Sequence, residues 1–249
     1  MMRRLLRRDF LKIAGGFALA STIPLPKSAM GGALDKFFGA PARLTPAITP
    51  NEEFYVTSYR SPPSVDMRDW ALTLKGLVEK PLTLSYLQLL ARPGVSEIVT
   101  LECIGNRIAG DAVSTAAWEG VPLKALLVEA EIHSKAYDVV FRAADGYSDS
   151  ITIERALVGD VLVAYRMNGA PLPQGHGFPA RIIVPGVYGM KSVQWLTEIE
   201  LVEQDYRGYY QKQGWSDEAT VKTMSRIDLP GHGETISAGI YDVKGLAFA

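Results

Sequence analysis

The sequence predicts a mixed α+β domain in which strands dominate. Many short runs rich in β-branched and aromatic residues are separated by residues that favour turns. Helix-like stretches are few and short, and no strand–helix alternation of the kind that builds parallel sheets repeats along the chain. The chain has 249 residues, 47% of them hydrophobic and 21% charged, so it can form one sizeable domain or two small ones.

The first part of the predicted domain mixes strand and helix signals. Residues 51–60 are aromatic and prone to β structure, and residues 70–76 alternate apolar and polar side chains as a half-buried strand does. Residues 82–90 carry leucines at helical spacing, with Thr83 or Ser85 available as the N-cap. We expect these leucines to pack in the core.

Most of the remaining elements are predicted as strands. They comprise residues 95–101, 137–143, 149–153, 161–167, 180–184 and 195–202. Asn168-Gly169 is a common hairpin turn. Residues 118–127 indicate a turn leading into a short amphipathic helix, residues 154–157 indicate a single helical turn, and Ser216 is a candidate helix start.

The amino terminus resembles a twin-arginine export signal. Arg7-Arg8-Asp9-Phe10-Leu11-Lys12 precedes a mildly apolar run that contains glycine and is short for a bilayer-spanning helix. A basic amphipathic helix or a simple anchor is the alternative. We expect residues 1–29 to be the signal, residues 30–50 a linker or arm, and residues 51–249 the folded domain. The resemblance implies the export machinery as a partner and a periplasmic location, with a membrane tether if the signal is not cleaved after Ala29.

Composition excludes some other classes of partner. Lys and Arg total 26 against 27 Asp and Glu, so no overall positive field favours nucleic acid or an anionic membrane. The single cysteine cannot form an internal disulfide, and it therefore carries no information about the redox compartment.

That cysteine, Cys103, follows the predicted strand at residues 95–101 and precedes a polar, glycine-containing loop. A thiolate delivered into a loop can anchor a soft or redox-active metal at one point. A solitary cysteine is also often a small buried hydrophobe, so this signal needs its context.

A second constellation lies in residues 176–195. A glycine-containing loop follows the predicted strand at residues 180–184 and is flanked by His176, Arg181 and Lys191. Backbone N–H groups and cations in this arrangement can bind a phosphate group. Taken singly, Arg181 and Lys191 would each be interpreted as ordinary surface charges, and His176 as a histidine of a turn. The apolar residues between them favour a binding site instead.

Taken in order, these and other motifs resemble the molybdopterin domain of the sulfite oxidase family. The segments that carry the resemblance are Phe54-Tyr55, residues 70–77, Lys80-Pro81-Leu82, residues 101–107, residues 118–123, Asp145-Gly146-Tyr147, residues 164–169, residues 176–181 and residues 189–196. They cover roughly residues 50–210.

The resemblance implies a role for each matching residue. Cys103 would be the protein ligand of molybdenum, and Tyr206 would donate a hydrogen bond beside the metal-oxo group, with Tyr209 as its rival. The residues expected to hold the pterin and its phosphate are Phe54, Tyr55, Asn106, Arg107, Asp145, His176, Arg181, Lys191, Ser192, Val193 and Gln194.

The sequence departs from the sulfite-oxidising members at positions that matter for substrate. Thr57-Ser58-Tyr59 stands where those members have Arg-Asn-His, and Ile108 stands where they have a second arginine. A buried anion without fixed cations is strongly disfavoured, so sulfite is a poor fit unless Arg60 or Arg207 substitutes. We also expect no immunoglobulin-like dimerisation domain and no haem domain in this chain.

The sequence therefore predicts an exported molybdenum-molybdopterin oxidoreductase that transfers oxygen atoms in two-electron steps. A reductase of S- or N-oxides, such as methionine sulfoxide, is favoured, and a sulfite dehydrogenase is the alternative. Electrons would be exchanged with a separate partner, either a cytochrome c or a membrane haem or quinol protein.

Two functions of other classes remain open. The first is a non-catalytic scaffold of the same fold, in which Cys103 is a packed thiol. The second is a hydrolase with Cys103 as the nucleophile and His176 or His133 as the base.

Overall fold

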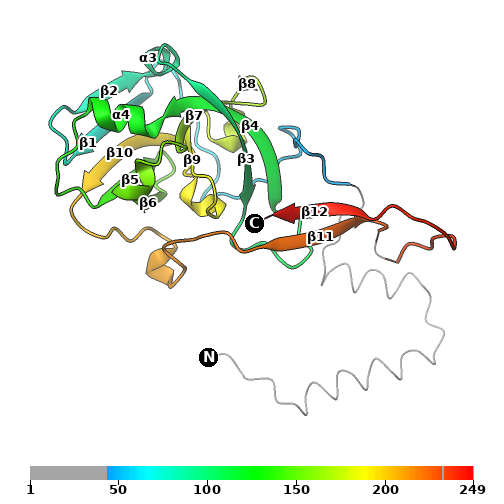
Figure 1. The fold of residues 1–249 in the computed structure, drawn as a ribbon. Coiled ribbons are helices and arrows are strands. Elements are labelled where there is room, and N and C mark those ends of the chain that lie inside the picture. Colours follow the sequence, from blue (N-terminus) through cyan, green and yellow to red (C-terminus); the bar gives the residue numbers. More distant parts are fainter. Residues whose placement is uncertain (1–43, 232, 249) are drawn as a thin grey trace.

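The computed structural model describes residues 44–231 and 233–248, in which strands dominate (Figure 1). Residues 1–29, predicted as the export signal, and the first part of the predicted arm lie outside the described residues. None of the described helices is long and apolar enough to cross a membrane.

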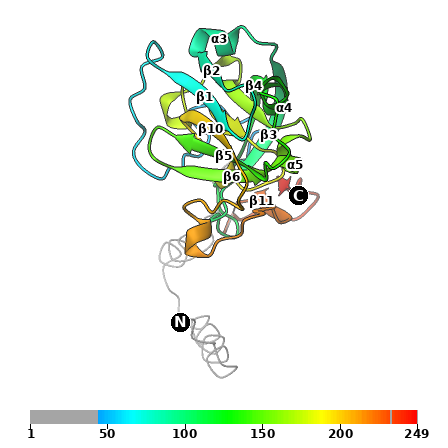
Figure 2. The ribbon, with the colours of Figure 1, turned by 90° about the vertical axis from the view of Figure 1, so that its left-hand side faces the viewer.

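The first sheet has five strands (Figure 2). Their order is β2 (Leu82–Ser85), β1 (Ala71–Gly76), β10 (Leu196–Val202), β5 (Asp138–Ala143) and β6 (Ser148–Thr152). The pair β1–β10 is parallel, and the other pairs are antiparallel. Strand β1 thus joins the early hairpin to strands that come much later in the sequence.

The second sheet is antiparallel throughout. It contains β3 (Val95–Glu102), β4 (Val113–Pro122), β7 (Leu162–Met167) and β8 (Ala170–Pro171), and β9 (Arg181–Ile183) also pairs with β7. Asn168 and Gly169 both have positive φ, as a two-residue hairpin turn requires, which confirms the turn predicted there.

The helical segments are short. They are α3 (Tyr86–Leu90), α4 (Leu123–Glu129), α5 (Ile153–Ala156) and the 3₁₀ turns η1 (Gln174–His176), η2 (Gly189–Lys191) and η3 (Gln211–Gln213). Helix α3 begins with a capping box, in which Ser85 Oγ accepts from Gln88 N and Gln88 Oε1 accepts from Ser85 N.

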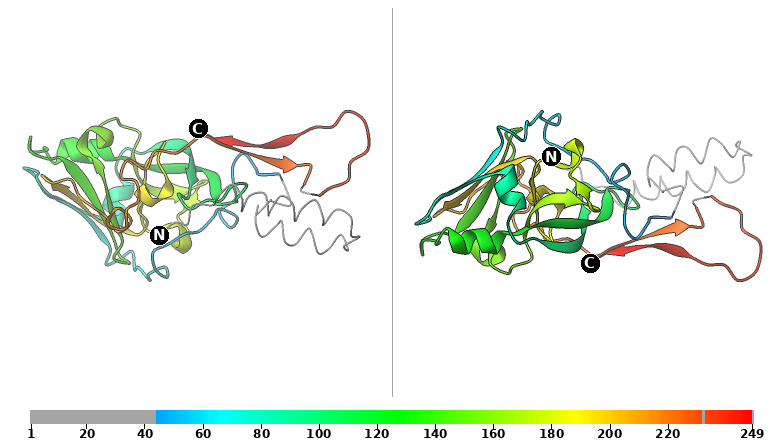
Figure 3. Two further views of the ribbon diagram at one scale, coloured as in Figure 1. Left: turned by 90° about the horizontal axis from the view of Figure 1, so that it is seen from below. Right: turned by 90° about the horizontal axis from the view of Figure 1, so that it is seen from above.

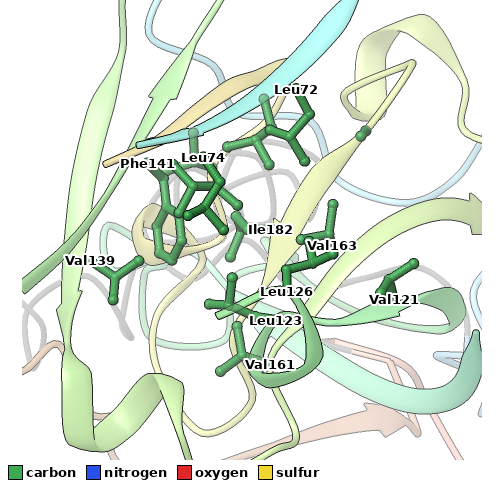
Figure 4. Packing of buried hydrophobic residues seen from close by; sticks show 14 of the residues in the cluster. Leu72, Leu74, Val121, Leu123, Leu126, Val139, Phe141, Val161, Val163 and Ile182 are labelled. Carbon is green, nitrogen blue, oxygen red and sulfur yellow. The ribbon is translucent and has the colours of Figure 1, made fainter. Parts of the chain in front are cut away.

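The main core fills the space between the two sheets (Figure 4). Leu72, Leu74 and Phe141 from the first sheet meet Val163 and Ile182 from the second. All of these side chains are at most 2% exposed, so the hydrophobic effect binds the two sheets and α4 into one unit. A smaller cluster surrounds Trp118, which has no exposed surface.

The strands predicted from residue 95 to residue 202 are confirmed, with ends shifted by one or two residues. Strand β4 was not predicted, and residues 118–122 belong to it where a turn was expected. The short helix expected after that turn is present as α4. The predicted helix at residues 82–90 is wrong in its first half, where β2 pairs with β1 and the helix starts only after Ser85. Leu87 is 76% exposed, so not all the leucines join the core.

Residues 51–60 form turns and irregular backbone, not a strand. The rings of Phe54 and Tyr55 stack with centroids 5.5 Å apart and an interplanar angle of 19°. Successive side chains of a strand point to opposite faces, so two neighbouring rings could not stack in that way. Ser216 does not start a helix; its hydroxyl accepts from Ala219 N within a turn.

No strand was predicted for the last described segment, which forms a hairpin of β11 (Met224–Leu229) and β12 (Lys244–Phe248). It extends away from the two sheets (Figure 3). Two buried side chains tie its base to the domain. Asp228 accepts from Thr45 N, and Arg226 donates to Thr45 Oγ1 and to the carbonyl of Gly110.

A buried carboxylate connects the first sheet to the loops that follow it. Asp149 in β6 has no exposed surface and pairs with Lys191 Nζ at 2.9 Å. It also accepts hydrogen bonds from the Tyr147 hydroxyl and from Gln211 Nε2, each at 2.9 Å. One side chain of β6 therefore fixes η2 and η3.

Replacing Lys191 with methionine should lower the free energy of unfolding by about 3–5 kcal/mol, because Asp149 would lose its buried counter-charge. Urea unfolding of the cofactor-free proteins measures the loss. Lys75→Met is the matched control, since the pair of Lys75 with Glu198 is exposed and its removal should leave the unfolding midpoint nearly unchanged. Equal effects in the two variants would contradict the structural role given to Asp149.

Candidate active site

A cavity of about 270 Å³ that opens to solvent lies where five segments meet. This volume lies near the lower end of the range of small-molecule and cofactor sites. The lining residues are Phe54, Tyr55, Thr57, Ser58, Tyr59, Leu101, Cys103, Ile104, Gly105, Asp145, Tyr147, Arg181, Gly189, Met190, Ser192, Val193, Gln194, Trp195, Tyr210 and Trp215.

Cys103 lines this cavity directly after β3 and is partly exposed. The loop that follows it is held in shape by its own hydrogen bonds. Cys103 N donates to Ala112 O at 2.9 Å, and Asn106 N donates to Cys103 O at 2.8 Å. Asn106 also accepts from Ala112 N and donates to Glu102 Oε1 at 3.0 Å. The thiol therefore has a fixed position at the cavity wall.

Four residues predicted to hold the cofactor do not line the cavity, and two of them, Asn106 and Arg107, belong to the loop after Cys103. Asn106 instead maintains the shape of the cysteine loop. It packs so closely on Gly110 that a Cβ there would lie 2.3 Å from Asn106 Oδ1. Arg107 is exposed on the outer side of the same loop.

Arg181 is a buried cation at the cavity wall, with 3% of its surface exposed. It donates to the carbonyls of His176 and Ser192 at 3.0 and 2.9 Å, and its guanidinium lies 5.0 Å from the centre of the Trp118 ring. Its Nε has no hydrogen-bond partner, and no carboxylate of the described residues forms an ion pair with it. Burial lowers its pKa to about 10, so it keeps its charge at neutral pH.

A buried, uncompensated cation is costly unless a ligand supplies the negative charge. Arg181 therefore marks where an anionic group such as a phosphate would bind.

Two tyrosines of the cavity lining, Tyr55 and Tyr210, are electrostatically coupled to Cys103. The pKa of Tyr55 is raised by burial and then by Cys103, and Arg181 opposes this shift. The pKa of Tyr210 is also raised by burial first and Cys103 second. Both hydroxyls therefore stay protonated at neutral pH and can donate hydrogen bonds into the cavity.

Other predicted cofactor residues do line the cavity. They are Phe54, Asp145, Ser192, Val193 and Gln194. Asp145 is 8% exposed and accepts from Tyr147 N at 2.9 Å, which shapes the turn between β5 and β6. Ser192 Oγ accepts from Val184 N, and Gln194 donates to Gly175 O.

His176 and Lys191 are buried behind the wall and do not line the cavity. His176 Nε2 lies 2.8 Å from the carbonyl of Asn51, so this nitrogen must be the protonated one and donate. Burial lowers the pKa of His176, which keeps the ring neutral. Lys191 Nζ forms ion pairs with Asp149 and Asp217 and donates a hydrogen bond to the carbonyl of Ser150. Both residues support the wall from behind.

Tyr206, predicted to act beside the metal, also lies outside the cavity. Its hydroxyl is 2.7 Å from Ser148 Oγ, and its backbone N–H donates to Asp138. Ser148 and Ser150 lie on the face of β6 opposite to Asp149, because side chains alternate along a strand. The chain crosses to the cavity only after Gly208, so Tyr210 lines it. Tyr209 is 41% exposed and does not line it.

The sequence interpretation missed Tyr210, Trp215 and the wall position of Tyr147. The adjacent pair Tyr209-Tyr210 was the available signal, because it directly follows the segment expected to carry the active-site tyrosine. Gln211, which bonds to Asp149, fixes which of the two lines the cavity.

The geometry does not support a cysteine hydrolase. His133 does not line the cavity, and its Nδ1 accepts a hydrogen bond from Lys135 N. His176 Nε2 donates to the carbonyl of Asn51. Among the described residues no group of three or more His, Cys, Asp or Glu side chains is arranged to hold a metal ion. A metal at Cys103 would thus need ligands from a cofactor.

Residues 59–210 match the family model described as the oxidoreductase molybdopterin binding domain. The chain belongs to this family. The molybdopterin-binding domain is 32% identical to mitochondrial sulfite oxidase of Homo sapiens, over 81% of this chain and 45% of that protein. It is 36% identical to the nitrate reductase [NADH] of Solanum lycopersicum, over 66% of this chain and 21% of that protein. The chain thus spans less than half the length of these relatives.

The fold matches a solved structure with a TM-score of 0.73, that of the sulfane dehydrogenase SoxCD from Paracoccus pantotrophus. The match covers 83% of this chain and 60% of that chain at 24% identity, and it supports the β-dominated α+β fold predicted from the sequence. The molybdopterin-binding domain is an oxidoreductase domain that takes molybdenum-molybdopterin as its cofactor.

The residues present fit that cofactor. The Cys103 thiolate would supply a soft ligand for molybdenum, and Arg181 would supply an unpaired buried cation for the phosphate of the pterin. Tyr55 lines the same cavity and is electrostatically coupled to both residues. When bound, the cofactor would supply the redox chemistry.

Replacing Arg181 with glutamine should lower the molybdenum and pterin content of the purified protein by about tenfold or more, because the buried phosphate would lose its counter-charge. Metal analysis and fluorescence of the extracted pterin measure both. Arg107→Gln is the control, and we expect full loading because Arg107 is exposed away from the cavity. Loss of cofactor from the Arg107 variant alone would contradict the assignment.

Proposed function

We propose that the domain reduces neutral S- or N-oxides by two-electron oxygen-atom transfer. In this reaction the S–O or N–O bond breaks, two protons and two electrons are consumed, and the oxygen leaves as water. The relatives named sulfite oxidase and nitrate reductase support oxygen-atom chemistry as the reaction class.

The charge of the cavity is the observation that carries this proposal. Among the described residues that line it, Arg181 is the one cation, and it is buried where the cofactor phosphate is expected. The two arginines that could have replaced the missing anion-binding residues do not line the cavity. Arg60 lies 5.0 Å from the ring of Tyr59, and Arg207 pairs with Asp205 and Asp217. A neutral oxide needs no further cation.

Tyr210 is our candidate for the group that contacts the oxygen during transfer. It lines the cavity near Cys103, and its raised pKa keeps the hydroxyl protonated. A protonated tyrosine can donate a hydrogen bond to an oxygen on which negative charge develops. We therefore assign the role of hydrogen-bond donor to Tyr210 and not to Tyr206, whose hydroxyl is bound to Ser148.

We further propose that electrons come from a separate protein, a cytochrome c or a membrane haem or quinol protein. One cysteine is too few to hold an iron–sulfur cluster, so this chain cannot provide such a relay by itself. The twin-arginine motif at Arg7-Arg8 supports export of the loaded domain to the periplasm.

Sulfite oxidation is the second candidate, because the chain is 32% identical to human mitochondrial sulfite oxidase. Sulfite oxidation would require the cavity to bind an anionic substrate. Among the described lining residues Arg181 is the one cation, and it is expected to bind the cofactor phosphate.

The loaded enzyme should reduce methionine sulfoxide with a chemically reduced dye as electron donor and should not oxidise sulfite with a dye or cytochrome c as acceptor. Steady-state kinetics with both substrates tests this. Sulfite turnover without sulfoxide turnover would overturn the proposal in favour of a sulfite dehydrogenase. A folded protein that takes up neither molybdenum nor pterin would support the scaffold.

Tyr210→Phe should lower kcat for the preferred substrate by about 10²-fold with a small effect on KM, because one hydrogen bond to the reacting oxygen is lost. Molybdenum content should stay unchanged, which separates the effect from cofactor loss. Tyr206→Phe should keep activity within about twofold, since its hydroxyl lies outside the cavity. The reverse ranking of the two variants would restore Tyr206 as the active-site tyrosine.

A further inference from the structure

Four aromatic side chains form a continuous row along one side of the cavity, which we call the aromatic wall: Tyr59, Tyr147, Tyr210 and Trp215. The ring centroids of successive members are 6.0, 5.9 and 5.8 Å apart. Tyr209 packs behind the wall, 4.5 Å from Tyr59 and 5.1 Å from Tyr210. The row therefore has one face toward the cavity and support from behind.

The wall leads from the interior to the mouth of the cavity. Tyr147 is 9% exposed and is fixed by hydrogen bonds from its hydroxyl to Asp149 and to Met190 O. Trp215 is 41% exposed, although its backbone N–H is bound to Tyr210 O. A large apolar ring that lines a cavity and is nevertheless exposed to water has surface available for a ligand.

The aromatic wall and Arg181 belong to different parts of the cavity lining. The guanidinium of Arg181 packs on the Trp118 ring and donates to the carbonyl of His176, and Phe54, which stacks on Tyr55, contacts the rings of the same two residues. The wall residues instead contact one another and Tyr209. A cofactor whose phosphate reaches Arg181 would occupy the Tyr55 side and leave the aromatic wall for another molecule.

The charges near the wall do not favour an ion as that molecule. The guanidinium of Arg60 lies against the Tyr59 ring and would repel a cation at this end. Asp145 lines the cavity next to Tyr147, and burial makes an additional anion beside it unfavourable. Leu101, Ile104, Met190 and Val193 add apolar surface to the cavity.

We infer that the aromatic wall binds the organic body of the substrate, and that this body is uncharged and aromatic or bulky and apolar. The inference rests on the proposed reduction of S- or N-oxides and specifies their class. Aryl sulfoxides or aromatic N-oxides would stack on the wall while the oxygen faces Cys103. Small oxides such as dimethyl sulfoxide would leave the wall unused.

Binding can be measured without turnover in the oxidised, fully loaded enzyme with no electron donor, by calorimetric titration with methyl phenyl sulfoxide and dimethyl sulfoxide. We expect the aryl compound to bind about tenfold more tightly, because its ring buries apolar area against other rings. Trp215→Ala should weaken aryl binding about 3- to 10-fold and change dimethyl sulfoxide binding by less than twofold.

Two further variants make the test specific. Tyr59→Ala removes the other end of the wall and should show the same selective loss for the aryl compound. Tyr137→Ala removes a tyrosine that is 47% exposed outside the cavity, and we expect no change for either compound. Equal affinity of the wild type for both sulfoxides, or an unchanged preference in both wall variants, would overturn the inference.

Turnover assays separate this inference from the proposed reaction. If aryl binding depends on Trp215 but no sulfoxide is reduced when electrons are supplied, the wall is an aryl-binding site and the proposed reaction is wrong. If both sulfoxides are reduced with equal KM in the wild type and in Trp215→Ala, the reaction is supported and the role of the wall is rejected.

Discussion

The carboxylate of Asp149 is the interaction on which the arrangement of the site depends. It is completely buried, and its partners come from three different segments: Lys191 from η2, Gln211 from η3 and Tyr147 from the β5–β6 turn. Burial raises the pKa of this carboxyl, and Lys191 opposes the shift. Because each partner is next to or part of the cavity wall, the same group that stabilises the fold sets the shape of the cavity.

Asp149 has a buried counter-charge in Lys191, whereas Arg181 has none among the described residues. The two terminal nitrogens of Arg181 donate to carbonyl oxygens and its guanidinium packs on an aromatic ring, but its Nε has no partner and none of the described carboxylates neutralises its charge. The domain keeps a buried cation whose negative partner must come from outside the chain. Stability of the cofactor-free fold is thereby exchanged for affinity toward an anionic cofactor, since a ligand that binds only the folded state stabilises it.

Local patterns were sufficient for many strands. The alternation in residues 71–76 and the Asn168-Gly169 turn directly specify β1 and the β7–β8 hairpin. Local patterns did not predict the elements whose conformation depends on long-range contacts. Leu82 and Leu84 follow a strand period because β1 is their partner, which the leucine spacing alone could not reveal.

The site was predictable where the residue type determines the chemistry, as for Cys103 and Arg181. It was not predictable where the direction of a side chain decides the role. Tyr206 and Tyr210 are four positions apart, and the bond of Tyr206 to Ser148 and the bond of Gln211 to Asp149 together explain why Tyr210 lines the cavity and Tyr206 does not. His176 and Lys191 were recognised as important residues, but His176 Nε2 bonds to the carbonyl of Asn51 and the charge of Lys191 is paired with Asp149.

The base of the β11–β12 hairpin has a consequence for biosynthesis. Arg226 donates to the carbonyl of Gly110, which ends the loop that starts at Cys103, and to Thr45, although these residues are 116 and 181 positions away in the sequence. The cysteine loop therefore receives this support only after residue 226 has left the ribosome. We expect molybdenum to be loaded after translation, into a domain that is already folded, and a nascent chain that stops before the hairpin to be a poor acceptor.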